Sequence, residues 1–205
     1  MRFLIPLIIL LAASISRADD DALKMFSERL APLAEIRTVQ ADYIQTRKIK
    51  SLNLSLKITG AMALEKNGRL FWHAKSPLSC ISIISEDSLR QWDAETGKVI
   101  TISATRFPWL KFLYSSMSEW MSGDLEKLKN NFQIEVKDDY TLVLVPQQKM
   151  FAEFIAKAEI KFSPKYDSIA EMTFFERNGD VLHFEYNNTF VNQNIPEEKW
   201  ILLPK

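Results

Sequence analysis

The sequence predicts an α+β protein, mainly β, in which a curved antiparallel sheet carries helices on one face. Three observations predict it. Short segments with an apolar residue at every second position recur along most of the chain. Turn-forming pairs such as Asn67-Gly68 and Asn178-Gly179 separate some of these segments, as in β-hairpins. Two stretches, near the N-terminus and from 107 to 131, show the three- and four-residue apolar spacing of helices.

The first 18 residues have the three parts of a secretory signal peptide. Met1-Arg2 gives a cationic start, Phe3 to Ala13 is an apolar run, and Ala18 ends a stretch that suits cleavage. The apolar run is about half the roughly 20 residues that a membrane-spanning helix needs. We therefore expect residues 1–18 to be removed on export. No Gly-, Ser- or Pro-rich tract divides the remainder, so residues 19–205 are expected to form one domain.

The charge balance and the cysteine content argue against a nucleic-acid partner, an intramolecular disulfide and a lipid anchor. Loss of Arg2 and Arg17 with the signal leaves 24 basic and 26 acidic residues, a net charge of −2. Because nucleic-acid-binding domains carry a basic field, this balance argues against a nucleic-acid partner. Cys80 is the sole cysteine, so no intramolecular disulfide can form. No cysteine follows the apolar run of the signal either, so we expect no lipid anchor.

An amphipathic helix is predicted from Asp20 to about Arg37. Apolar residues recur there at steps of three and four: Leu23, Phe26, Leu30, Leu33 and Ile36. Because Pro32 lies inside this pattern, the helix is expected to kink or restart there.

From Val39 to Ser103 the apolar period is two, which predicts a series of strands. One predicted half-buried strand carries alternating apolar residues at Leu52, Leu54, Leu56 and Ile58. Between Gly60 and Trp92, consecutive hairpin strands are expected to gather one apolar face, made of Met62, Leu64, Leu70, Trp72 and Trp92.

Residues 107–131 interrupt the strands with a helical insertion rich in Met and aromatic residues. Gly123 is expected to end one helix and Asp124 to cap a second, shorter one. Further strands are predicted at 132–137, 141–146, 158–163, 170–177, 181–188 and 199–203. A twisted sheet with this many strands tends to curl.

A curved sheet covered by such a helical lid can enclose an apolar volume that suits lipid chains. The candidate lipid-binding residues are the apolar sets of the sheet and the insertion: Met62, Leu64, Leu70, Trp72, Trp92, Leu113, Met117, Trp120 and Met121. We expect no enzyme, cofactor or metal. The two isolated histidines and one cysteine lack zinc-ligand spacing, and the sequence has no phosphate-binding Gly-rich loop or G-x-S-x-G turn.

Several short motifs follow one another over almost the whole mature chain. They are Ala41 to Gln45 (A-D-Y-I-Q), Lys66 to Trp72 (K-N-G-R-L-F-W), Ser76-Pro77, Ser85 to Trp92, Ser122 to Leu125 (S-G-D-L), Leu142 to Pro146 and Asn192 to Pro204. Their order and spacing resemble the LolA family, the periplasmic carriers of outer-membrane lipoproteins. Asn67 stands where the family has proline and Leu70 where it has Phe, which places the chain in a divergent branch.

The resemblance implies an unclosed half-barrel with a helical lid over an apolar cavity, in a carrier from the periplasm of a Gram-negative bacterium. It implies lipoprotein acyl chains or another lipid as cargo, an inner-membrane transporter as donor and an outer-membrane acceptor. We expect a soluble monomer. In the family, a basic residue near the first hairpin bonds the lid backbone and holds the empty cavity shut. Lys66 occupies that position, with Arg69 three residues later, so both are candidate latch residues.

Two other functions remain open. The cavity could carry another lipid, such as a glycolipid or a fatty-acyl product bound for the outer membrane. Alternatively, the sheet could be a non-enzymatic interaction module of the cell envelope, which predicts no lipid-sized cavity. The lipid that copurifies with the protein distinguishes these possibilities.

Overall fold

The computed structural model describes residues 20–66, 68–106, 119–120 and 123–202. Within these ranges the chain forms one antiparallel sheet of 11 strands, in the order β6-β5-β4-β3-β2-β1-β11-β10-β9-β8-β7. The strands are β1 Thr38–Ile49, β2 Leu54–Glu65, β3 Leu70–Ser76, β4 Cys80–Ile84, β5 Ser88–Asp93, β6 Val99–Ser103, β7 Phe132–Asp138, β8 Thr141–Pro146, β9 Ile155–Phe162, β10 Ile169–Glu176 and β11 Val181–Val191.

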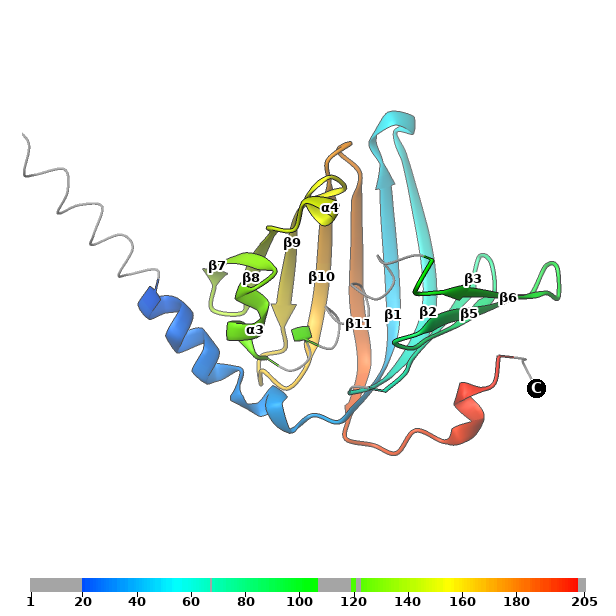
Figure 1. Ribbon diagram of the computed structural model, residues 1–205, viewed down its shortest axis with the longest axis horizontal. Helices are drawn as coiled ribbons and strands as arrows, with labels where there is room; N and C mark the ends of the chain where they lie inside the picture. The colour runs from blue at the N-terminus through cyan, green and yellow to red at the C-terminus, as the bar shows by residue number, and fades with distance from the viewer. Residues whose placement is uncertain (1–19, 67, 107–118, 121–122, 203–205) are drawn as a thin grey trace, which may run out of the picture.

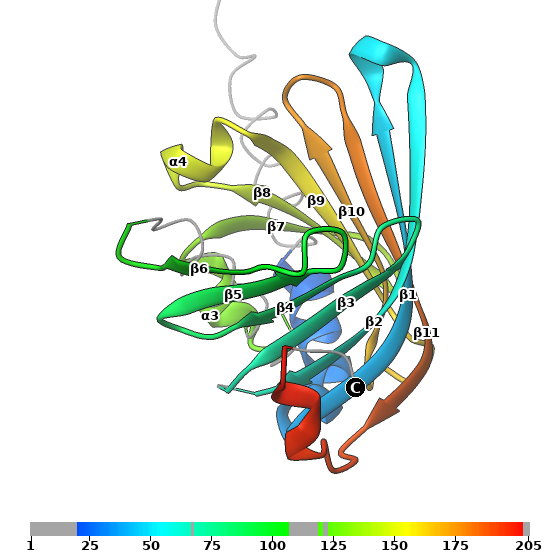
Figure 2. The same ribbon diagram turned by 90° about the vertical axis from the view of Figure 1, so that its right-hand side faces the viewer.

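The sheet curves strongly but does not close (Figure 2). Strands β1 to β6 form one meander and β7 to β11 another, and the pairing of β1 with β11 joins them. The edge strands β6 and β7 lie at opposite ends of this order, so the described strands form an open half-barrel. The predicted fold class is confirmed.

The longest strands lie at the centre of the sheet, where β1 pairs with β2 from Thr38↔Glu65 to Ile49↔Leu54. Gly60 is opposite Tyr43 in this register. A Cβ atom at Gly60 would lie only 2.5 Å from the Tyr43 ring and hydroxyl. Glycine at this position therefore allows the Tyr43 ring to lie across β2 on the concave face.

Short helices cover part of the concave side (Figure 2). Residues 20–29 form an α-helix, followed by the 3-10 helices and short α-helices η1 Ala31–Glu35, η2 Lys50–Leu52, α3 Leu125–Lys129, α4 Lys149–Ala152 and η3 Glu197–Trp200. The first helix ends before Pro32 and resumes as η1, which confirms the predicted kink. The Asp124 side chain caps α3 by accepting a hydrogen bond from the Lys127 backbone N–H at 3.1 Å, also as predicted.

The sheet has an apolar cluster on each face. The concave cluster packs strands against the N-terminal helices and α3, with Phe26, Leu33, Leu125 and Leu144 among its buried members. The convex cluster is smaller and consists of Ala63, Phe71, Ile81, Ile83, Ile195, Trp200 and Leu202. The C-terminal segment thus packs on the outside of the sheet (Figure 1). The strand predicted at 199–203 is wrong over its described part, because residues 197–200 form η3.

A second difference concerns the β1–β2 hairpin. Residues 50–52 form the turn η2, and Asn53 follows it with a φ of 47°. The predicted half-buried strand therefore begins only at Leu54. Its first residues pair with β1 on one side and lie beyond the end of β3 on the other. Exposed fractions of 67%, 43% and 44% for Leu52, Leu54 and Leu56 show that nothing described covers this end.

Candidate binding cavity

The concave face of the sheet encloses an apolar cavity of about 360 Å³. Its walls come from both halves of the sheet, with contributions from α4 and from Trp120. Lining residues are Gln45, Leu70, Trp72, Ser82, Ile84, Leu89, Trp120, Phe151, Ile155, Met172, Phe174, Glu176, Leu182, Phe184 and Tyr186. Most of them are apolar, so an apolar ligand would meet few polar groups whose burial is costly.

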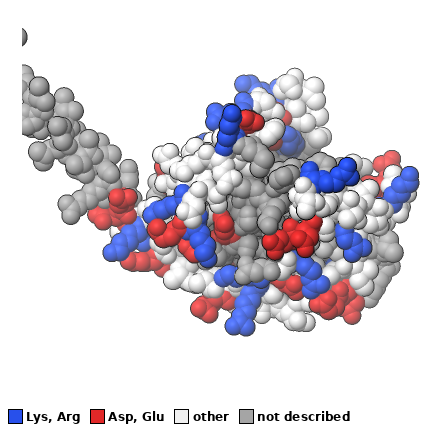
Figure 3. Space-filling view, viewed as in Figure 1, with Lys and Arg blue, Asp and Glu red and all other residues white. Residues whose placement is uncertain are grey.

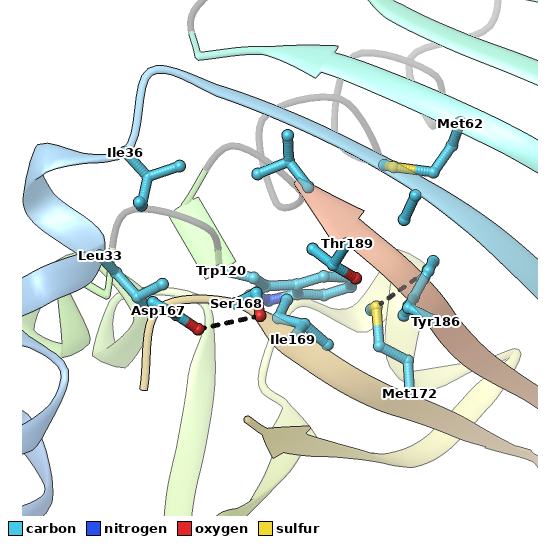
Figure 4. A pocket seen from close by; sticks show the side chains of 12 residues that line it. Leu33, Ile36, Met62, Trp120, Asp167, Ser168, Ile169, Met172, Tyr186 and Thr189 are labelled. Carbon is cyan, nitrogen blue, oxygen red and sulfur yellow. Dashed lines mark hydrogen bonds between the residues drawn. The ribbon is translucent and has the colours of Figure 1, made fainter. Parts of the chain in front are cut away.

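A smaller pocket of about 40 Å³ lies beside the cavity, between the N-terminal helices and the sheet. Figure 4 shows its residues, with the Trp120 indole between Leu33 and Met172. Trp120, Met172 and Tyr186 line both spaces. The Trp120 indole therefore forms part of the boundary between the two.

Trp120 is almost fully buried, with 2% of its surface exposed. Its ring centroid lies 5.9 Å from that of Phe174 and 6.1 Å from that of Phe132. The indole Nε1 is buried and has no hydrogen-bond partner in the described parts of the chain. An unsatisfied buried donor costs about 1–3 kcal/mol, so Trp120 fills space well but carries a polar penalty in this position.

Aromatic rings continue across the cavity wall from β1 to β10. Trp72 lies 4.3 Å from Tyr43 and 5.5 Å from Phe184, and Phe184 lies 6.4 Å from Phe174, measured between ring centroids. Burial raises the pKa of both Tyr43 and Tyr186 above the ordinary phenol value. Both phenols are therefore neutral at physiological pH, and this part of the wall carries no charge.

The structure brings several of the predicted lipid-binding residues together. Leu70 and Trp72 line the larger cavity, Met62 lines the smaller pocket, and Leu64 belongs to the concave cluster. Trp120 lines both spaces. Leu113, Met117 and Met121 lie outside the described residues.

The prediction that Trp92 shares the apolar face of Trp72 is wrong, because Trp92 lies on the opposite face of the sheet. It pairs with Ile81 and packs against the convex cluster. Trp72 pairs instead with Ser82, one position along β4. Since neighbouring residues of a strand point to opposite faces, Trp72 and Trp92 cannot share one wall.

Most of the cavity wall was not predicted, since Leu70, Trp72 and Trp120 are the predicted residues among the 15 that line it. The largest missed part comes from the second meander and α4: Phe151, Ile155, Met172, Phe174, Glu176, Leu182, Phe184 and Tyr186. The strands themselves were predicted. Alternation in β10 and β11 marked their apolar faces, but it did not indicate what those faces enclose.

The two candidate latch residues differ in what they bind. The Lys66 Nζ donates a hydrogen bond to the Ala34 carbonyl oxygen at 2.8 Å, which ties the β2–β3 turn to η1. Arg69 instead forms ion pairs with Glu65 at 3.1 Å and Glu197 at 3.0 Å, and its guanidinium lies 4.3 Å from the Trp200 ring centre. Arg69 therefore holds the C-terminal segment on the convex face, whereas the Lys66 side chain reaches η1. Which of the two is the latch stays a prediction.

Other chemistry is sparse in the described part of the chain. No group of three His, Cys, Asp or Glu side chains within it is placed to hold a metal ion. Burial raises the pKa of the Cys80 thiol, which disfavours the reactive thiolate. None of the helices that the structure describes is both long and apolar enough to cross a membrane.

The described strands thus form an open half-barrel with an apolar cavity on its concave face. The model of the family "Outer membrane lipoprotein carrier protein LolA" matches residues 34–200, and the chain belongs to this family. An outer-membrane lipoprotein carrier protein from Pseudomonas fluorescens (strain Pf0-1) is 22% identical over 98% of this chain and 92% of that protein. A protein of the same name from Idiomarina loihiensis is 19% identical over 82% of this chain and 78% of its own length.

A solved structure shares the fold. An uncharacterized conserved protein from Thermus thermophilus superimposes with a TM-score of 0.55, at 10% identity, over 90% of this chain and 95% of its own. At this identity the likeness concerns the fold alone.

Proposed function

We propose that this protein carries the acyl chains of a lipoprotein through the periplasm, from an inner-membrane transporter to an outer-membrane acceptor. The observation that carries the proposal is the apolar cavity of about 360 Å³ between the sheet and the helical layer. Similarity to proteins named outer-membrane lipoprotein carriers supports the same cargo. Residues 1–18 would be removed on export, with residues 19–205 as one monomeric carrier domain and no catalytic step.

A carrier must bind its cargo and also release it. Burying an acyl chain contributes about 0.8 kcal/mol per methylene, so one long chain supplies roughly 10 kcal/mol before any opposing term. Such binding alone would be too tight for transfer. The empty protein opposes this binding free energy, because cargo must displace buried side chains and break contacts of the helical layer.

Two contacts supply these opposing terms. Trp120 acts as a plug, because it fills the boundary between the two apolar spaces. Lys66 acts as the latch, because its bond to the Ala34 carbonyl joins the β2–β3 turn to η1. Loading displaces the plug and breaks the latch, which lowers the net affinity. Cargo then passes to any acceptor with a slightly better site.

Native mass spectrometry of protein purified from periplasm tests this function. We expect a bound species with the mass of a lipoprotein or of its acylated N-terminal peptide. Addition of a triacylated peptide should change tryptophan fluorescence, and the same peptide without acyl chains should not. Because Trp72 and Trp120 both line the cavity, Trp72→Phe should reduce the fluorescence change and leave the part that Trp120 reports.

The same experiment separates the cargo classes. If the bound species is a glycolipid or a free fatty-acyl compound and not an acylated peptide, the protein is still a carrier, but its cargo is another lipid. Absence of any bound lipid, together with unchanged fluorescence on addition of acylated peptide, would overturn the carrier proposal.

A further inference from the structure

The β1–β2 hairpin projects beyond the rest of the molecule, at the top of Figure 1. At its tip, Leu52 has 67% of its surface exposed, and Leu54 and Leu56 are 43% and 44% exposed. Three exposed leucines within five residues form a concentrated apolar patch. The face of the molecule seen in Figure 3 carries a mixture of acidic and basic side chains.

This apolar patch continues the cavity wall. Gln45 lines the cavity and pairs with Ile58 in the β1–β2 ladder. Because alternate residues share a face, Leu56 and Leu54 follow Ile58 on the same side of β2. Leu54 therefore lies roughly 13 Å farther along the strand than Ile58, at about 3.3 Å per residue. The concave apolar surface thus extends from the cavity to the tip of the hairpin.

Charge at the hairpin tip has one sign. Residues 47–57 include four basic and no acidic side chains. Arg47 is paired with Glu176 at 2.9 Å and with Asp180 at 3.4 Å. The side chains of three exposed lysines have no carboxylate within ion-pair distance in the described parts of the chain: Lys48, Lys50 and Lys57. They are available to an external anion.

A second exposed apolar residue lies at the same end of the molecule, next to α4 (Figures 1 and 2). Phe154 has 68% of its surface exposed. Its carbonyl accepts a hydrogen bond from the Arg177 N–H at 2.8 Å, in the β10–β11 turn, and Asp180 of that turn accepts one from the Lys50 N–H at 2.9 Å. Glu153, next to Phe154 in the chain, is also exposed and adds one negative charge beside this apolar residue.

We propose that this end of the protein docks on the surface of an anionic lipid bilayer. Leu52, with its neighbouring leucines, enters the interface, and the three lysines of the hairpin bind lipid phosphates. An apolar tip flanked by available cations matches the two contributions that hold peripheral proteins on membranes, burial of apolar surface and attraction to anionic headgroups. The proposal goes beyond the carrier function, because it depends on exposed residues and not on the cavity.

Vesicle flotation tests the proposal with the purified protein. We expect binding to phosphatidylcholine vesicles that contain phosphatidylglycerol, weaker binding when salt is added, and little binding to phosphatidylcholine alone. The variant K48Q/K50Q/K57Q should lose on the order of a hundredfold in vesicle affinity, at about a fivefold loss per lysine. Leu52→Ser should lose roughly tenfold.

Matched controls come from other exposed positions. Leu78 is 69% exposed, close to the value for Leu52, so Leu78→Ser should leave vesicle binding unchanged. The same is expected of the triple variant K24Q/K98Q/K165Q, whose lysines are exposed elsewhere. Cavity binding of an acylated peptide should be equal in all four variants, which separates failure of docking from failure of the carrier function.

Three results would overturn the proposal. The wild-type protein could fail to bind anionic vesicles at low salt, or the hairpin and control variants could bind them equally. The third is concentration-dependent self-association through the leucines without vesicle binding, which would make a second copy of the chain the occupant.

Discussion

Replacing Trp120 with alanine should weaken the fold and tighten cargo binding at the same time. Trp120 is 2% exposed and lines both apolar spaces, so its removal enlarges the cavity at its boundary. If Trp120 is a plug that cargo must displace, the variant binds cargo without that displacement. If it is simply a wall that cargo contacts, the variant loses contacts and binds more weakly.

The magnitude follows from the burial of the indole. A buried Trp side chain removes about 150–250 Å² from water, worth roughly 4–6 kcal/mol at about 25 cal/mol per Å². Displacement also lets Nε1, which lacks a partner among the described residues, form a hydrogen bond and recover about 1–3 kcal/mol. The net cost of moving the plug is therefore about 3 kcal/mol. Its absence should tighten binding on the order of a hundredfold.

Two measurements on the same samples test this prediction. Denaturant unfolding should show a loss of about 3–5 kcal/mol for Trp120→Ala, as for other large-to-small core changes. Titration with a fluorescent acyl ligand should show the tighter binding. Leu128→Ala is the matched control, since Leu128 is also 2% exposed but lines neither space. It should lose stability with unchanged affinity. Affinity that falls in parallel with stability in Trp120→Ala would refute the plug.

Variants at three further positions test other contacts. Lys66→Ala removes the bond to the Ala34 carbonyl and should speed loading of an acyl ligand several-fold in stopped-flow measurements, with Lys66→Arg restoring the slower rate. Arg69→Ala removes the pairs with Glu65 and Glu197 and should raise hydrogen exchange in residues 195–202 without changing acyl affinity. Asp124→Ala should lower the free energy of unfolding by about 1 kcal/mol. The hydrogen bond from the Lys127 backbone N–H holds the pKa of the Asp124 carboxyl below its ordinary value. The carboxylate therefore stabilises the fold fully at pH values above the ordinary pKa, and this stabilisation is lost as pH falls through the lower pKa of the folded state. Asp124→Asn should keep the cap in urea unfolding but lose this pH dependence.

Local sequence patterns predicted most strands because each strand buries one face. The period of two does not show what covers that face, and this is why the hairpin was misread. Leu54 and Leu56 keep the alternation of a half-buried strand. They pair with β1, but β3 ends at Ser76, opposite Thr59, and the two leucines are 43% and 44% exposed. The turn at Lys50–Leu52 contains neither glycine nor proline, and its turn formers, Ser51 and the left-handed Asn53, lie among apolar residues that keep the strand alternation.

The candidate site was only partly predictable for a related reason. Which wall a residue joins depends on strand register, and a shift of one position moves a side chain to the other face. Trp92 is opposite Ile81, and this pairing places it outside. The second half of the cavity wall depends on the pairing of β1 with β11, two segments far apart in the chain. No local pattern reports such a contact.

Every second side chain of β2 lies on the concave face, and these residues connect the cavity with the exposed hairpin. Met62 lines the smaller pocket, and Ile58 packs against the concave cluster. Leu56 and Leu54 are the next residues on that face and point to solvent. An acyl chain that leaves a bilayer loses about 0.8 kcal/mol for each methylene exposed to water, so a bare path to the cavity would be a steep barrier. A continuous apolar strand face lowers that barrier by shielding methylenes along the path. Leu54 and Leu56, which are 43% and 44% exposed, would serve the proposed transfer in this way.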